Sequence, residues 1–258
     1  MDALNTATWL DPGIVSSYEG DTELQPAEAR IFDELRPRLA GWSMLDIGVG
    51  AGRTAFHLAP LAADYLGVDI SPHFVESCRR QFGSQGRFEV ADARNLSSMG
   101  EGRFDFVLFS FNGLDYLNHE ERLKSLAEIR RVCKPGAVFC FSTHNTQALP
   151  HVMGFRAQFT RRHPLVLYRN LSNWTRWRLF HSREVSEARA DKPDWAIVND
   201  GAHDCGLMTY YVRPGYQLTQ LQPAFGDVRV FSYGGEELTP ARLDSVEDDW
   251  LYYLCVAR

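Results

Sequence analysis

The chain has 258 residues, of which 45% are hydrophobic and 23% charged, the proportions of an ordinary globular protein. Its formal net charge of −6 argues against binding nucleic acid or an anionic membrane through bulk charge. The apolar runs are too short to span a membrane, and the first residues lack the basic and apolar regions of a secretory signal, so we expect a cytoplasmic protein. Its 5 cysteines are spread without a Cys-x-x-Cys pair, which disfavours a disulfide framework and a structural zinc site.

In chain order, residues 1–25 predict an irregular N-terminal arm, and a helix is expected to start near Pro26. From residue 43, short apolar runs alternate with amphipathic stretches. The expected strands are Ser43–Ile47, Tyr65–Asp69, Arg87–Ala91, Phe104–Ser110 and Ala137–Thr143. The expected helices are Arg53–Leu61, Pro72–Phe82 and Glu120–Cys133. This alternation predicts a doubly wound, mostly parallel α/β sheet covered on both faces.

The pattern changes after Thr143, and we interpret residues 151–206 as a lid or substrate-binding insertion after the fifth strand. Residues 207–258 are expected to complete the same sheet. Their expected elements are the strand Leu207–Val212, the helix Pro214–Phe225, and the strands Val228–Tyr233 and Trp250–Ala257. The predicted organisation is an arm (1–25), a cofactor-binding core (26–150), the insertion (151–206) and a C-terminal part of the sheet (207–258).

A glycine-rich turn follows the first expected strand and contains Gly48, Gly50 and Gly52. Glycines allow unusual backbone angles and the close approach of a ligand, at a turn where parallel sheets bind ligands. A dinucleotide fingerprint needs a small residue where Arg53 stands, and a phosphate-binding loop needs a Gly-Lys-Ser/Thr sequence that is absent. A carboxylate just before the glycines, at Asp46, favours a cationic ligand over a pyrophosphate.

Aspartates end the first three expected strands, at Asp46, Asp69 and Asp92. Because consecutive strand ends converge on one edge of the sheet, the three carboxylates are expected to line one crevice. Asp69 is placed to accept both hydrogen bonds of a ribose diol, and Asp92 is placed to meet an adenine amino group. Each aspartate taken alone could equally cap a helix, but three in register behind a glycine turn favour a bound nucleoside.

Together these segments resemble the class I S-adenosylmethionine-dependent methyltransferases. The resemblance is carried by Leu45–Gly52, Gly67–Ser71, Val90–Ala93, Phe104–Ser110 and Leu126–Gly136. It implies an enzyme with S-adenosyl-L-methionine as cofactor and a seven-stranded, Rossmann-like sheet whose final strand is antiparallel. The strands expected after residue 225 fit that ending.

The resemblance also implies a set of cofactor-binding residues: Tyr18, Asp46, Gly48, Gly50, Gly52, Asp69, Ile70, Asp92, Ala93 and Ser110. The glycines would border the methionine part, with the preceding aspartate near its ammonium group and the serine beside it. The other two aspartates would hold the ribose and flank the adenine. The tyrosine of the arm would close the pocket, or it is an ordinary arm residue.

The C-terminal third is similar to the small-molecule branch that includes glycine N-methyltransferase and the sugar N-methyltransferases. His144, at the end of the fifth strand, is the catalytic candidate, because an oxygen nucleophile usually needs a general base whereas a neutral amine does not. A hydrogen-bonded structural histidine is the alternative. The substrate-binding candidates are Asn112, Tyr116, Asn145, His203 and Tyr211.

The arginine-rich segment 155–183 admits three interpretations: a solvated lid, a site for an anionic substrate, or a nucleic-acid surface, which the acidic remainder of the chain disfavours. We expect no metal, no nucleic acid and no membrane as partners, and a homodimer is left open. The predicted reaction is methyl transfer to an oxygen or nitrogen of a small polar metabolite, such as a sugar, a nucleotide sugar or a specialised-metabolite intermediate. The alternatives are an NAD-dependent oxidoreductase and a non-catalytic cofactor-binding protein of the same fold.

Overall fold

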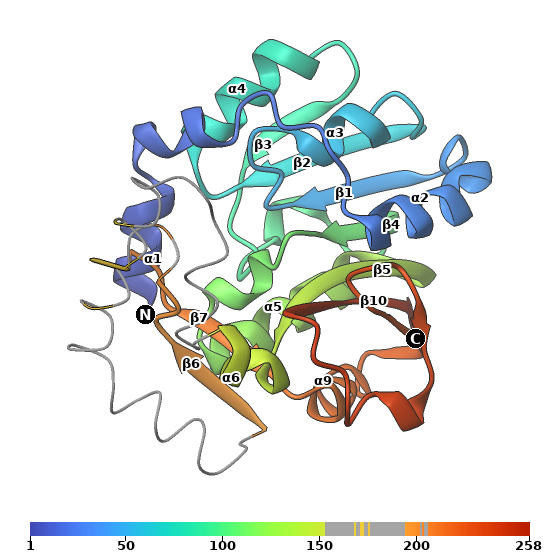
Figure 1. Ribbon diagram of the computed structural model, residues 1–258. Helices are drawn as coiled ribbons and strands as arrows, with labels where there is room; N and C mark the ends of the chain where they lie inside the picture. The colour runs from blue at the N-terminus through green and yellow to red at the C-terminus, as the bar shows by residue number, and fades with distance from the viewer. Residues whose placement is uncertain (153–167, 169–170, 173–174, 176–193, 202, 204–205) are drawn as a thin grey trace.

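The computed structural model of the chain describes residues 1–152, 168, 171–172, 175, 194–201, 203 and 206–258 (Figure 1). Its strands are β1 (Ser43–Ile47), β2 (Asp64–Asp69), β3 (Arg87–Val90), β4 (Phe104–Phe109), β5 (Cys133–Asn145), β6 (Trp195–Val198), β7 (Thr209–Val212), β8 (Phe225–Phe231), β9 (Glu237–Leu238) and β10 (Trp250–Ala257). Its α-helices are α1 (Asp2–Trp9), α2 (Pro26–Leu39), α3 (Arg53–Leu58), α4 (Pro72–Phe82), α5 (His119–Val132), α6 (Leu149–Val152) and α9 (Pro214–Leu221). Short 3₁₀ helices are η1 (Pro12–Ser17), η2 (Ser97–Met99), η3 (Gly113–Tyr116), η4 (Thr146–Ala148) and η6 (Pro240–Arg242).

The strands form one sheet in the order β3-β2-β1-β4-β5-β10-β8-β9. The first five of these are parallel, whereas β10 runs antiparallel to both β5 and β8. The expected mostly parallel sheet with an antiparallel final strand is therefore confirmed, but the sheet has ten strands instead of the expected seven, because β6, β7 and β9 add to it. Most expected boundaries are close to those observed, but β5 already begins at Cys133, and the expected helix Pro214–Phe225 ends at Leu221 because Phe225 begins β8.

Two apolar layers cover the sheet because successive strand residues point to opposite faces. In β1, Met44 packs on the face covered by α2, α3 and α4, while Leu45 packs on the face covered by α5 and α9 (Figure 1). Phe106 and Val107 of β4 divide in the same way between the two faces. This alternation also determines the face of the sheet on which each polar side chain of a strand lies.

The carboxyl end of β5 extends beyond the central sheet and carries two further strands. His144 and Asn145 pair in parallel with Tyr211 and Val212 of β7, and β7 pairs antiparallel with β6. This extension places the end of the fifth strand beside β7 and, through β7, next to β6. Among the described residues, no helix is long and apolar enough to cross a bilayer.

The N-terminal arm differs from the irregular segment expected, because it contains α1 and η1. Asn5 holds α1 in place: its amide donates to the carbonyl oxygens of Tyr116 and Met208, each at 2.8 Å, and its oxygen accepts from the amide N of Met208 at 2.8 Å. These long-range bonds have no signature in the local sequence.

The arginine-rich segment 155–183 and most of the expected insertion lie outside the described residues.

Candidate functional site

The glycine turn between β1 and α3 adopts backbone conformations that favour glycine. The φ angles of Gly48, Gly50 and Gly52 are 64°, 54° and 94°. A Cβ at Gly48 would lie 2.9 Å from the Phe109 ring, and one at Gly52 would lie 2.3 Å from the Phe82 ring, so both are packed closely. A Cβ at Gly50 would meet nothing within 4 Å, because this glycine faces open space.

That open space is a cleft at the carboxyl ends of β1, β2 and β4, with an empty volume of about 1230 Å³ including its open mouth. The sequence-predicted residues in its wall are Tyr18, Gly48, Gly50, Asp69, Ile70, Asp92, Ala93, Ser110 and Tyr116. Thus the arm, the glycine turn and the ends of the next strands meet around one cavity. Asp46 and Gly52 lie behind the wall.

Asp69 presents a buried carboxylate to the cleft. One oxygen accepts a hydrogen bond from the main-chain N of Gly50 and the other from that of Ser71, both at 2.9 Å. Burial raises the pKa of this carboxyl to about 6 despite these bonds. Each oxygen keeps a second lone pair, so the carboxylate can accept two further hydroxyl donors.

Asp92 also borders the cleft, but its carboxylate is paired with an arginine. Arg94 donates to both carboxylate oxygens of Asp92, with Nη2 at 2.6 Å, and also pairs with Glu121 at 2.7 Å. Burial acts to raise the pKa of Asp92, but the hydrogen bonds from Arg94 lower it below its ordinary value. Any ligand group at this position therefore meets an ion pair instead of a free carboxylate.

Asp46 supports the glycine turn from beneath. Its Oδ2 accepts hydrogen bonds from the hydroxyls of Thr54 and Tyr65, both at 2.6 Å, and burial raises its pKa to about 6. The side chain shares the face of β1 with Met44, since residues two apart in a strand point the same way. The structure therefore does not bring Asp46 into the cleft with Asp69 and Asp92.

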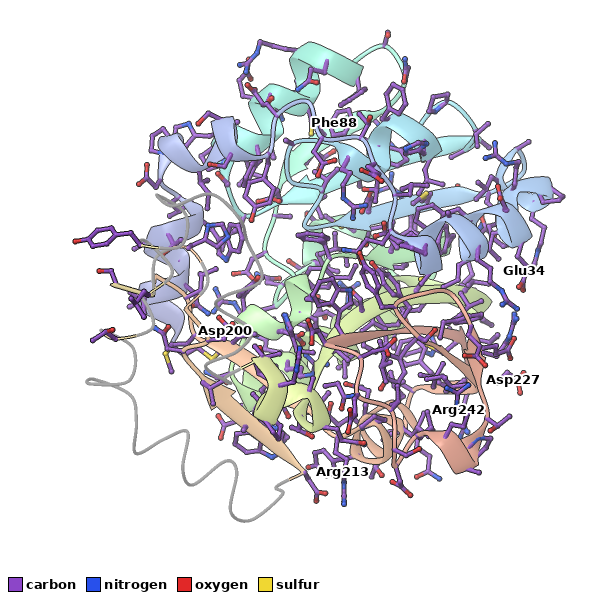
Figure 2. The ribbon with its side chains drawn as sticks, viewed as in Figure 1. Glu34, Phe88, Asp200, Arg213, Asp227 and Arg242 are labelled. Carbon is purple, nitrogen blue, oxygen red and sulfur yellow. The ribbon has the colours of Figure 1, made fainter. Side chains whose placement is uncertain are left out.

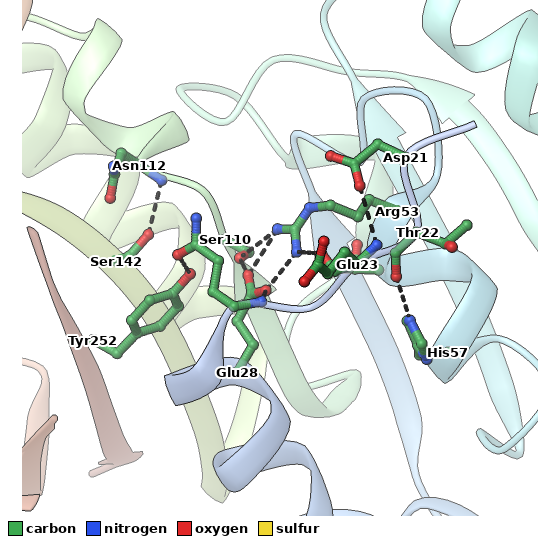
Figure 3. Close-up of polar contacts among 12 residues, drawn as sticks. Asp21, Thr22, Glu23, Glu28, Arg53, His57, Ser110, Asn112, Ser142 and Tyr252 are labelled. Atoms are coloured by element: carbon green, nitrogen blue, oxygen red, sulfur yellow. Dashed lines mark hydrogen bonds and ion pairs between the residues drawn. The ribbon is translucent and has the colours of Figure 1, made fainter. Parts of the chain in front are cut away.

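A buried carboxylate that was not predicted from the sequence, that of Glu28 on α2, lies behind Arg53 and Ser110 of the cleft wall (Figure 3). Arg53 binds it with two hydrogen bonds, of 2.5 and 2.8 Å, and the hydroxyl of Ser110 donates to it. Burial alone would raise the pKa of Glu28, but the bonds from Arg53 and Ser110 lower it overall. The available signal was the Gln25-Pro-Ala-Glu28 capping box, in which Glu28 accepts from the main-chain N of Gln25 at 2.9 Å.

An aromatic wall closes the side of the cleft toward the arm. The Trp9 ring contacts those of Tyr18, Tyr116 and His203, with ring centroids 6.3, 4.9 and 5.3 Å apart. The Tyr18 hydroxyl and the His203 Nε2 are hydrogen-bonded at 2.8 Å, and burial raises the pKa of Tyr18 to about 12. The candidates Tyr18, Tyr116 and His203, which are far apart in sequence, therefore lie together around Trp9. Trp9 itself was not predicted from the sequence.

His144 is not among the residues that line the cleft; it contacts Asn112 and Asp115 in the segment that follows β4. Its Nδ1 is 2.8 Å from Oδ2 of Asp115, which also accepts the main-chain N–H of His144 at 2.7 Å. The other oxygen of Asp115 pairs with Arg122 at 2.5 Å, and both of these side chains are completely buried. Asp115 and Arg122 were not predicted, because only the fold brings η3 and α5 against β5.

Comparisons with known proteins match this geometry to a family. A methyltransferase-domain family matches residues 44–136. The ubiquinone biosynthesis O-methyltransferase of Thiobacillus denitrificans is 29% identical over 149 residues, which cover 56% of this chain and 61% of that protein. The norajmaline N-methyltransferase of Rauvolfia serpentina is 34% identical over 144 residues, covering 50% of this chain and 47% of that protein. The chain thus spans about half to three fifths of the length of these curated relatives.

Solved structures share the fold over nearly the whole chain. An S-adenosylmethionine-dependent methyltransferase from Mesorhizobium loti has a TM-score of 0.60 at 17% identity, covering 89% of this chain and 97% of that one. A 1,6-didemethyltoxoflavin-N1-methyltransferase from Burkholderia thailandensis, solved with 1,6-didemethyltoxoflavin and S-adenosylhomocysteine, has a TM-score of 0.58 at 16% identity, covering 99% of this chain and 88% of that one. Residues 44–136 form a class I methyltransferase domain. The expected family is confirmed, and S-adenosylmethionine is the cofactor of such a domain.

The methyltransferase domain ends at residue 136, so it contains Asn112 and Tyr116 but not the other substrate candidates. The buried side-chain amide of Asn145 is bonded to the main chain: it donates to the carbonyl oxygen of Val246 at 2.8 Å and accepts from the main-chain N of Gln147 at 3.0 Å. Tyr211 lies next to His144, with ring centroids 4.9 Å apart. Its hydroxyl donates to Asp200, labelled in Figure 2, at 2.9 Å.

Proposed function

We propose that this protein transfers the methyl group of S-adenosylmethionine to an oxygen or nitrogen atom of a small polar metabolite. The observation that carries the proposal is the cleft in which Gly50 faces open space beside the buried carboxylate of Asp69. The methyltransferase domain and the small-molecule activities in the names of the relatives support it. The acceptor would enter beside Ser110 and Tyr116, and a homodimer or an anionic acceptor is compatible with the proposal.

The residues of the cleft fit the cofactor in charge and space. Asp69 has lone pairs for the two ribose hydroxyls, and Ile70 and Ala93 offer apolar contacts beside Asp92 for the adenine. Gly48, Gly50 and Ser110 would border the methionine part. Asp46, behind the turn, would contribute its charge without direct contact.

When bound, the cofactor supplies a methyl group on a positively charged sulfur, which leaves alignment and the exclusion of water to the protein. The aromatic wall formed by Trp9, Tyr18 and Tyr116 would exclude water on the side of the arm. Glu28 and Arg53 hold the hydroxyl of Ser110 in the cleft wall. His144 would accept a proton from the acceptor if the acceptor needs to lose one.

Calorimetry with S-adenosylmethionine tests the proposal. Asp69→Ala should weaken binding by about 1–3 kcal/mol, because the ribose hydroxyls lose a buried acceptor. Asp64→Ala, at the opposite end of the same strand and half-exposed, is the matched control and should leave affinity unchanged. Absence of binding by the wild-type protein, or equal losses in the two variants, would refute the proposal.

A further inference from the structure

Asp92 and Arg94 form a closed ion pair in the wall of the cleft. Oδ1 of Asp92 accepts from Nε of Arg94 at 2.9 Å, and Oδ2 accepts from Nε at 2.9 Å and from Nη2 at 2.6 Å. Oδ1 also accepts the main-chain N–H of Arg94 at 2.8 Å. Because each carboxylate oxygen has two lone pairs, these contacts engage the accepting capacity of both oxygens.

Glu121 holds the same arginine from a second element, α5. Its Oε1 accepts from Nη1 of Arg94 at 2.7 Å, and its Oε2 accepts the main-chain N–H of Asn118 at 3.0 Å. The latter bond belongs to the capping box of α5, so the start of this helix fixes the glutamate. The guanidinium is thus anchored to two carboxylates, and swinging away from Asp92 would also break its bond to Glu121.

An uncharged amino group is a poor competitor for this carboxylate. The amino group of a nucleobase would form one hydrogen bond to it, whereas the guanidinium forms charge-assisted bonds through a planar fork that matches a carboxylate. Burial acts to raise the pKa of Asp92, but the bonds from Arg94 lower it overall, so the carboxylate is ionised at neutral pH. The ion pair is therefore expected to stay closed when a nucleoside enters the cleft.

The residues next to the ion pair offer apolar contacts. Ala91 and Ala93 flank Asp92 in the chain and line the cleft, as does Ile70 after the neighbouring strand β2. Apolar contacts are non-directional, so they stabilise a flat base without distinguishing its polar substituents. The directional acceptor at this end of the cleft is Asp69, which is placed for the ribose.

We propose that Arg94 makes the cleft indifferent to the 6-amino group of the purine ring, because it occupies the carboxylate of Asp92 that would otherwise accept a hydrogen bond from that group. This inference rests on the proposed function and assigns Arg94 as the residue that sets specificity for the base. The cofactor is held through its ribose and its methionine part, and a purine without the amino group binds equally well. The expectation that Asp92 meets the amino group holds only for a chain that lacks this arginine.

Calorimetry with two ligands that differ only at the purine 6-position tests the assignment. They are S-adenosylhomocysteine and its 6-deamino analogue, in which hydrogen replaces the amino group and the ring nitrogens are unchanged. We expect the wild-type protein to bind both with Kd values within about threefold, whereas a hydrogen bond to a charged acceptor would favour S-adenosylhomocysteine at least about tenfold. A wild-type preference of that size would overturn the proposal.

Arg94→Met removes the guanidinium and keeps an apolar side chain of similar reach. Asp92 is then free to accept from the amino group, and we expect this variant to bind S-adenosylhomocysteine at least about tenfold more tightly than the analogue. Arg87→Met is the matched control, because Arg87 lies on the same strand and pairs with Asp64 at 2.8 Å, both half-exposed and outside the cleft wall. It should keep the wild-type ratio. An Arg94→Met ratio equal to that of the wild type would overturn the role of Arg94.

The ion pair can also be followed directly, which keeps the proposal testable even if Arg94→Met fails to fold. We expect NMR of the wild-type protein to show that the Nε–H proton of Arg94 exchanges with water as slowly with S-adenosylhomocysteine bound as without it. Faster exchange in the complex would show that Asp92 is released, and would overturn the proposal. Failure of the wild-type protein to bind either ligand would instead refute the proposed function, so the two failures are distinguishable.

Discussion

The two sides of the proposed active site, the cofactor side and the acceptor side, are built differently. The cofactor side, from Gly48 to Ser110, is formed by strand ends and turns that follow one another along the chain. The acceptor side joins groups from η3, α5, β5 and β7 through Asp115, Arg122 and His144. A cleft formed by strand ends can thus be encoded locally in the sequence, whereas a network such as that of Asp115, Arg122 and His144 depends on tertiary packing.

Removing the buried arginine of the acceptor side should give the largest predicted effect, a loss of folding stability. We expect Arg122→Met to lower the free energy of unfolding by about 3–5 kcal/mol, because it leaves the charge of Asp115 buried without its arginine partner. Arg229→Met is the control: Arg229 pairs with Glu34 and Glu237 at the surface, and its loss should change stability by about 1 kcal/mol or less. Denaturant unfolding measures both. Equal losses would mean that the buried network is no more important than a surface one.

Breaking the cofactor side should give a smaller change in stability but a selective loss of binding. Gly50→Ala and Gly136→Ala both place a side chain at positive φ, 54° and 77°, with no atom within 4 Å of the new Cβ. Each should lose about 1–2 kcal/mol of unfolding free energy. Only Gly50→Ala should weaken S-adenosylmethionine binding, by about tenfold or more, since its methyl group enters the cleft. Calorimetry showing equal affinities would contradict this placement of the cofactor.

The smallest predicted effect is on the pH dependence of cofactor binding. Burial raises the pKa of Asp69 to about 6. The ionised carboxylate is the form that accepts two hydroxyl donors, so affinity should be full above pH 6 and fall as pH decreases through it. Between pH 7.5 and pH 5 we expect about a threefold to tenfold loss. Asp69→Asn should bind weakly at both pH values, which separates this effect from the titration of Asp46.

The sequence predicted most of the sheet and of the cofactor cleft, because strand periodicity and glycine spacing are local properties. Asp46 shows the limit on this side: its position at a strand end suggested the crevice, but its face of β1, shared with Met44, directs it to Thr54 and Tyr65. On the acceptor side, Asp115 looked like part of a loop. Its role depends on pairing between β4 and β5, which places Thr143 and His144 beside it.

The long-range hydrogen bonds of the Asn5 side chain have a practical consequence. By binding Tyr116 and Met208, Asn5 places the first helix against residues more than 100 positions away and brings Trp9 into the cavity wall. A recombinant version trimmed by nine residues would lack both Asn5 and Trp9, so the cleft would be open to solvent on that side.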